Sequence, residues 1–144
     1  MGYDLYRDTD DNGVGGYFRF SIWGFPPIRF LAEAYGWEPM GAIYYDEEGN
    51  EEEERMGYDT NDGQTVCAED ANNWADALEL VLKDNIVPEI DEYPDGRKID
   101  DDYMKERALI WTGDTIACAK YWSGESKYIQ EFIDFLREGE FVIW

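Results

Sequence analysis

Four residues near the start of the chain have the types and the spacing of a calcium-binding loop. Asp8, Asp10, Asn12 and Gly13 reproduce the pattern D-x-D-x-N-G with which an EF-hand loop begins. Such a loop needs a bidentate Glu at its twelfth position, but here that position is Arg19, a cation within a segment of strand periodicity. We therefore expect a solvated turn between two strands. Asp8, Asp10 and Asn12 are weak metal candidates only, and no cofactor is expected.

A second place for chemistry is the start of the segment CAEDANNWADALELVLK. Cys67 stands at the N-cap position of a predicted helix, with Asp70 three residues later in the place of a capping-box acid. A helix N-terminus stabilises a thiolate, but Glu69 and Asp70 oppose its formation. We expect a helix start at Cys67 rather than a nucleophile. Cys118, between two alanines, is predicted to be an inert core residue.

Composition excludes several kinds of site. The chain has no histidine, which excludes Ser-His-Asp and Cys-His nucleophile pairs and histidine-based zinc sites. Its two cysteines cannot form a four-cysteine metal centre within one chain. Neither a signal-peptide pattern nor an apolar run of roughly 18 residues is present. We expect a cytoplasmic protein, in its own cell or in an infected host, with reduced thiols and no membrane contact.

Negative charge is the dominant property of the chain. It has 34 acidic and 12 basic residues, a net charge of −22. Residues 46–106 alone hold 22 acidic and five basic residues, a net charge of −17. Such a field repels nucleic acids and anionic membranes and attracts basic proteins. We therefore expect a basic protein partner and no direct binding of nucleic acid.

Aromatic residues are abundant enough to predict a packed core, with six Trp, eleven Tyr and seven Phe. Trp37, Trp111 and Trp122 lie near the ends of predicted elements, where tryptophan can anchor a partner or a ligand. The remaining three tryptophans are predicted to fill the core, namely Trp23, Trp74 and Trp144.

Hydrophobic periodicity predicts an α+β fold over a single domain of residues 1–144. We expect a small, mainly antiparallel sheet with three to four helices packed on one face. Strands are predicted at residues 3–7, 17–23 (central or half-buried) and 141–144, with a hairpin joining 42–45 to 55–58. Helices are predicted at residues 26–35, 67–83, 103–111, 115–122 and 128–136. The helix at 67–83 is expected to be the structural centre, with Asn61-Asp62-Gly63 as its capped start.

Five segments together resemble a family of small, uncharacterised bacterial and phage proteins. They are MGYDLY, YFRFSIW, AYGWEP, NDGQTVCAEDA and FIDFLREGEFVIW. Their order along the chain, reaching both termini and the middle, carries the resemblance. It implies one intact domain and transfers no activity, cofactor or catalytic residue.

The charge favours a small acidic inhibitor of the immunity or phage anti-defence type. It would mask a basic, nucleic-acid-binding surface of a nuclease, a toxin or a nucleic-acid-guided complex by charge mimicry. The contact residues are expected in two acidic runs, namely Glu47, Glu48, Glu51, Glu52, Glu53, Glu54, Asp91, Glu92, Asp95, Asp100, Asp101 and Asp102.

Two other functions remain open. One is a small-molecule binding or sequestering protein, with an aromatic-lined pocket near Trp37, Tyr44 and Trp111 that takes a cationic or neutral ligand. The other is a carboxylate-dependent enzyme, although no motif selects a catalytic pair among 34 acids. We therefore predict a binding protein rather than an enzyme. If none of these holds, the acids serve only to keep the chain in solution.

Overall fold

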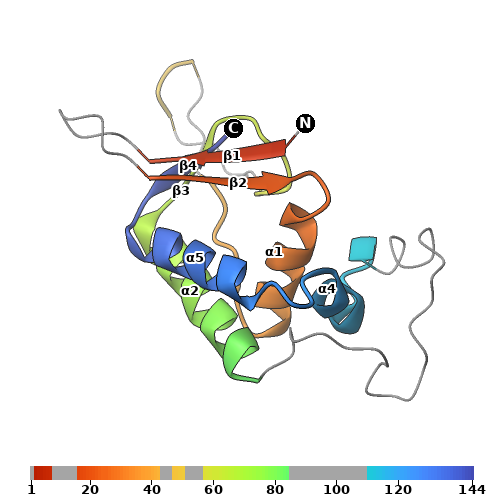
Figure 1. Cartoon of the computed structure of the whole chain (residues 1–144). Coiled ribbons are helices and arrows are strands. Elements are labelled where there is room, and N and C mark those ends of the chain that lie inside the picture. The colour runs from red at the N-terminus through yellow and green to blue at the C-terminus, as the bar shows by residue number, and fades with distance from the viewer. Residues whose placement is uncertain (1, 8–15, 43–46, 51–56, 85–109) are drawn as a thin grey trace.

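A four-stranded antiparallel sheet organises the chain. The computed structural model describes residues 2–7, 16–42, 47–50, 57–84 and 110–144. Within them the strand order is β2-β1-β4-β3, formed by β1 (Gly2–Tyr6), β2 (Tyr17–Ser21), β3 (Gln64–Val66) and β4 (Phe141–Ile143). The described helices lie on one side of this sheet (Figure 1): α1 (Phe25–Ala34), α2 (Ala68–Lys83), α4 (Thr115–Tyr121) and α5 (Ser126–Arg137). The predicted α+β fold is confirmed.

The strands alternate between a helix-covered face and an open face. Leu5, Phe20 and Ile143 point into the core and are almost fully buried. Their neighbours point the other way because successive side chains of a strand lie on opposite faces. Tyr6 pairs with Tyr17 of β2 on one side and with Val142 of β4 on the other.

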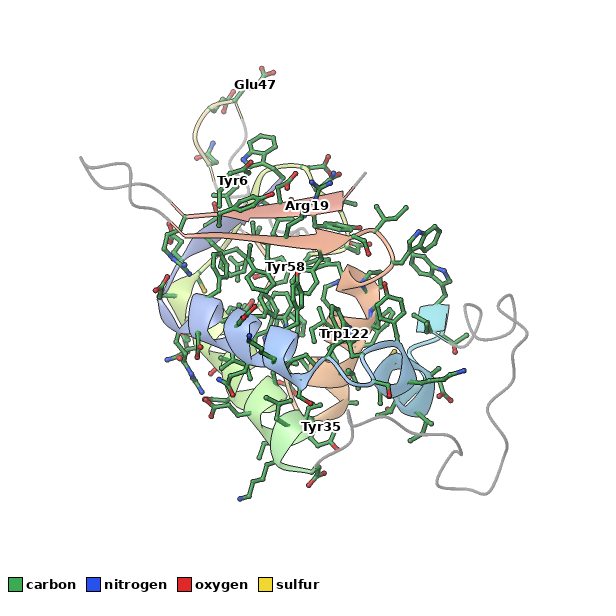
Figure 2. The ribbon with its side chains drawn as sticks, in the orientation of Figure 1. Tyr6, Arg19, Tyr35, Glu47, Tyr58 and Trp122 are labelled. Carbon is green, nitrogen blue, oxygen red and sulfur yellow. The ribbon has the colours of Figure 1, made fainter. Side chains whose placement is uncertain are left out.

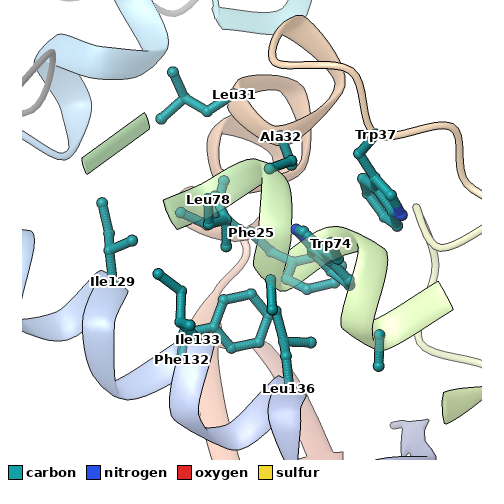
Figure 3. Packing of buried hydrophobic residues seen from close by; sticks show 14 of the residues in the cluster. Phe25, Leu31, Ala32, Trp37, Trp74, Leu78, Ile129, Phe132, Ile133 and Leu136 are labelled. Atoms are coloured by element: carbon teal, nitrogen blue, oxygen red, sulfur yellow. The ribbon is translucent and has the colours of Figure 1, made fainter. Parts of the chain in front are cut away.

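Helix α2 provides the central wall of the core, as its periodicity predicts. Its buried face includes Ala71, Trp74 and Leu78, at spacings of three and four residues. The ring of Trp74 is fully buried and makes an edge contact with Phe132 of α5, at a centroid distance of 5.1 Å. Figure 3 shows these side chains packed between α2 and α5. Complete burial of a large apolar side chain contributes about 1.5–3 kcal/mol.

Two arginines fasten α5 to the rest of the molecule. Arg137 in its last turn bonds Asp76 at 2.7 Å and Glu79 at 2.9 Å, both on α2. Arg7, just after β1, donates to the carbonyls of Phe135 at 2.7 Å and Gly139 at 2.8 Å. A guanidinium group thus satisfies carbonyls at the helix end that have no partner within the helix.

Several local predictions are wrong. The strand predicted at 17–23 ends at Ser21 and lies at an edge of the described sheet rather than at its centre, although it is half-buried, which was the other predicted alternative. Trp23 and Trp144 are 40% and 56% exposed rather than buried. Asn61-Asp62-Gly63 does not begin α2, because β3 follows it and pairs with β4. That strand has three residues, too few for its alternation to stand out in the sequence.

Other predicted elements lie largely outside the described residues. This applies to the hairpin of 42–45 with 55–58, and to the helix at 103–111. No helix in the part of the chain that is described is long and apolar enough to cross a bilayer.

Candidate functional site

The described part of the predicted acidic surface is a turn on the open side of the sheet. Glu47 and Glu48 are exposed there, and Figure 2 shows Glu47 beyond the strands, on the side opposite the helices. The remaining predicted contacts lie outside the described residues: Glu51, Glu52, Glu53, Glu54, Asp91, Glu92, Asp95, Asp100, Asp101 and Asp102. The weak metal candidates Asp8, Asp10 and Asn12 lie outside them as well.

Three large aromatic side chains are exposed on the open face of the sheet. Tyr6 is 47% exposed, Tyr17 is 51% exposed and Trp144 is 56% exposed. The Tyr6 and Tyr17 rings belong to paired residues, and their centroids are 5.0 Å apart. Trp144 extends the line of β4 and exchanges two backbone hydrogen bonds with Asp4 of β1. We call Tyr6, Tyr17 and Trp144 the aromatic face.

Polar contacts hold part of this face in place. Tyr17 donates its hydroxyl proton to the carboxylate of Asp4 at 2.6 Å, and Arg19 lies 3.8 Å from the same carboxylate oxygen. The hydrogen bond to Asp4 is the main reason that the pKa of Tyr17 is raised. The Trp144 ring lies against Gly63, where a Cβ atom would come within 2.6 Å of it. The exposed rings are therefore positioned by neighbours across the sheet.

Intramolecular contacts engage much of the positive charge in the described residues. Arg137 is paired with two carboxylates, and Arg7 with Glu138 at 3.2 Å. Arg19 lies beside Asp4, and the guanidinium of Arg29 lies over the rings of Phe25 and Phe30. The described segments hold 18 of the 34 acids and seven of the 12 bases, so the remaining charge that faces solvent is strongly negative.

A cavity of about 420 Å³ brings together two of the three residues predicted to line a ligand pocket. Trp37 and Trp111 both line it, whereas Tyr44 lies outside the described residues. Trp37 is 3% exposed, and Trp111 is 56% exposed. The remaining lining residues come from α1 and from two loops: Arg29, Phe30, Glu33, Pro39, Gly57, Tyr58 and Asp59. We call this the Trp37–Trp111 cavity.

Arg29 is the cation in the wall of this cavity. Its guanidinium carbon lies 5.4 Å from the ring centroids of both Phe25 and Phe30. Burial lowers the pKa of Arg29, and the carboxylates of Asp59 and Glu33 partly offset this. Burial also raises the pKa of Glu33. The Nε atom of Arg29 is buried and has no hydrogen-bond partner among the described residues.

Behind the cavity, the carboxylate of Asp70 is fully buried and accepts three hydrogen bonds. The donors are the Trp37 indole at 2.9 Å, the Met40 backbone at 3.1 Å and the Tyr58 hydroxyl at 2.5 Å. Asp70 therefore holds Trp37, Met40 and Tyr58 together, a structural role that the prediction of a capping box did not include. Cys67 does cap α2, because its sulfur accepts from the Asp70 amide at 3.4 Å.

Trp122, the third tryptophan left open by the sequence, is buried between the β2–α1 turn and α5. It stacks on Tyr128 at 5.5 Å and lines a cavity of about 330 Å³ with Phe20 and Tyr121. Cys118 on the same helix is fully buried, as predicted, and burial raises the pKa of its thiol to about 12. No group of three or more Cys, Asp or Glu side chains within the described segments could hold a metal ion.

Comparison with family models, with curated proteins and with solved structures finds no match to this chain. The site residues that sequence reasoning missed are Arg29, Tyr6 and Tyr17. The alternation of β1 and β2 could have placed the two tyrosines opposite the core. Nothing in the sequence marked Arg29 as a cavity residue, because α1 buries most of its circumference.

Proposed function

We propose that the protein binds a basic protein partner and masks a surface on which that partner holds nucleic acid. The observation that carries the proposal is the position of the aromatic face. It lies on the open side of the sheet, and the exposed turn with Glu47 and Glu48 lies on the same side. We place this activity in the cytoplasm, of the cell that encodes the protein or of an infected host.

Charge supports the choice of a basic partner. The net charge of −22 attracts a cationic surface over distances of about a Debye length, roughly 8–10 Å at physiological salt. Complementary potential mainly accelerates encounter and selects the partner. It also opposes association of two copies of this chain, and it opposes nucleic acid as a direct ligand.

The aromatic face supplies anchor side chains for the interface, which charge alone does not provide. Tyrosine and tryptophan are the side chains most often found at the energetic centre of a protein interface. Tyr6, Tyr17 and Trp144 are exposed while their backbones are held in the sheet, so little conformational entropy is lost on binding. We assign them the role of anchors, with Glu47 and Glu48 at the acidic rim.

The test is a pull-down from host lysate at about 0.05 M and about 0.5 M NaCl, followed by competition with nucleic acid. A captured basic protein should lose its affinity for nucleic acid when this protein is added. Capture that is unweakened at about 0.5 M salt, or captured proteins that bind nucleic acid equally well in its presence, would contradict charge mimicry.

A second candidate function is binding of a small molecule in the Trp37–Trp111 cavity. Its support is that two residues far apart in sequence, both predicted for such a pocket, line one cavity of about 420 Å³. This volume lies within the roughly 300–1,000 Å³ typical of small-molecule sites. A thermal-shift screen of metabolites tests it, and a screen without any ligand that raises Tm would contradict it.

A further inference from the structure

We propose that the Trp37–Trp111 cavity binds a planar, uncharged heteroaromatic molecule that carries both N–H donors and carbonyl or ring-nitrogen acceptors, as a purine nucleoside does. This inference rests on the second candidate function and names its ligand class. It does not depend on the protein-binding proposal.

The walls of the cavity favour a flat ring. Trp111 lines the cavity and is 56% exposed, and Phe30 of α1 adds a partly buried aromatic ring, whereas Trp37 lies at the back of the cavity and is 3% exposed. Trp37 is held firmly, because its ring stacks on Trp74 at 4.3 Å and its indole N–H is bonded to Asp70. A planar ligand can stack on the exposed ring of Trp111, with the buried Trp37 as a fixed wall behind it.

The polar groups of the cavity determine which hydrogen-bond donors and acceptors a ligand must carry. Arg29 lines the cavity, and its guanidinium can only donate hydrogen bonds. The carboxylates of Glu33 and Asp59 line the same cavity and, when ionised, can only accept. A ligand that satisfies both kinds of group must present acceptors and donors on one molecule.

Charge excludes the two simpler ligand classes. An organic cation would pair with Glu33 or Asp59 but would face the guanidinium of Arg29. A phosphate or carboxylate would satisfy Arg29, but it would face these two acids and a protein of net charge −22. An uncharged base avoids both conflicts, so a nucleoside should bind better than its nucleotide.

The experiment is a titration of the full chain, followed by NMR and calorimetry, with guanosine as the probe. Guanine offers O6 and N7 as acceptors and N–H groups as donors. Guanosine 5′-monophosphate tests the effect of charge, and indole tests a flat ring without acceptors. We expect guanosine to bind at least about fivefold more tightly than either control compound.

The matched variants are Trp111→Ala and Trp144→Ala, since both side chains are 56% exposed and only Trp111 lines the cavity. Trp111→Ala should weaken guanosine binding by about fivefold or more, and Trp144→Ala by less than about twofold. Arg29→Met should abolish the preference for guanosine over indole. If Arg29→Met unfolds, Trp111→Ala decides the matter, because its exposed side chain can be removed at little cost to folding.

Binding of the monophosphate or of indole as tightly as guanosine would overturn the ligand class, as would equal effects of the two tryptophan variants. If guanosine does not bind but another screened compound does, and if Trp111→Ala abolishes the binding of that compound, the proposed ligand class is wrong and the second candidate function is retained. No ligand of any kind at this cavity would overturn both.

Discussion

The hydroxyl group of Tyr58 donates a hydrogen bond of 2.5 Å to the carboxylate of Asp70, in the first turn of α2. Because Trp37 and the backbone of Met40 donate to the same buried carboxylate, one side chain connects three separate segments. Two of these segments, residues 37–40 and 57–59, line the Trp37–Trp111 cavity together with α1 and Trp111. The position of its aromatic wall therefore depends on Asp70.

Replacing Asp70 with alanine should destabilise the protein severely. The substitution leaves two buried donors and one partly buried donor without their acceptor, and each unsatisfied buried group costs about 1–3 kcal/mol. We expect a loss of at least about 3 kcal/mol in the free energy of unfolding, measured by urea denaturation. Glu69→Ala is the control, because Glu69 is exposed in the same helical turn and should change stability by about 1 kcal/mol or less. Equal effects of the two variants would refute the role of Asp70.

Stability should fall as the pH rises above about 10, the pKa of an unperturbed tyrosine. Burial and the hydrogen bond to Asp70 raise the pKa of Tyr58, and burial and the bond to Asp84 raise that of Tyr35 to about 12. A group with a raised pKa in the folded state contributes stability below its unfolded pKa and loses it as the pH rises. Urea unfolding between about pH 8 and pH 11 measures this, and Tyr58→Phe should flatten the decline. A stability that is constant or rising over this range would contradict the assignment.

The two cysteines should differ sharply in reactivity. Cys118 is fully buried, and burial raises the pKa of its thiol to about 12, whereas Cys67 is partly exposed at the start of α2. A thiol reagent should modify one cysteine in the native protein and two in denaturant, as counted by mass spectrometry. Cys67→Ser should then show no native modification. Rapid native labelling of Cys118 would show that α4 opens readily.

Gly63→Ala should disturb both the backbone and the aromatic face. Gly63 has a φ of +81°, and a Cβ atom there would lie 2.6 Å from the Trp144 ring. Gly49→Ala is a matched control, because Gly49 has a φ of +84° and no atom of the described residues lies within 4 Å of the added Cβ. Both variants incur the backbone cost of about 1 kcal/mol, but only Gly63→Ala should also shift the Trp144 indole signal in NMR spectra. Identical stability losses and an unshifted indole would contradict the contact.

The extent to which the sequence predicts this fold depends on element length. Helices α2 and α5 have strong periodicity over 16 and 12 residues, so their buried faces could be read directly. Strand β3 has three residues, and only its pairing with β4 identifies it. Trp144 was expected to be buried because tryptophan is apolar, but its place in the alternation after Ile143 turns it to the open face.

The candidate sites, like the fold, could be predicted from the sequence only in part. The cavity residues Trp37 and Trp111 were identifiable as tryptophans near element ends, but their meeting depends on tertiary packing. Arg29 could not be assigned, because Asp59 and Trp111, which line the cavity with it, come from distant parts of the chain. The acidic turn with Glu47 and Glu48 was predictable from charge alone, since a run of carboxylates must stay solvated.

The affinity of a captured basic partner for matched surface variants tests whether the open face of the sheet is the binding surface. Tyr6→Ala with Tyr17→Ala removes two anchors, and Tyr121→Ala is the control, an exposed aromatic residue on the helical side. Glu47→Gln with Glu48→Gln removes two rim charges, and its control is Glu131→Gln with Asp134→Asn, exposed on α5.

We predict that the double tyrosine variant raises the Kd by about tenfold or more, and that the Glu47 and Glu48 variant weakens its salt dependence. Both controls should leave the Kd within about twofold of that of the unmodified protein. If each variant and its control have the same Kd, the open face of the sheet is not the binding surface, and the account is contradicted.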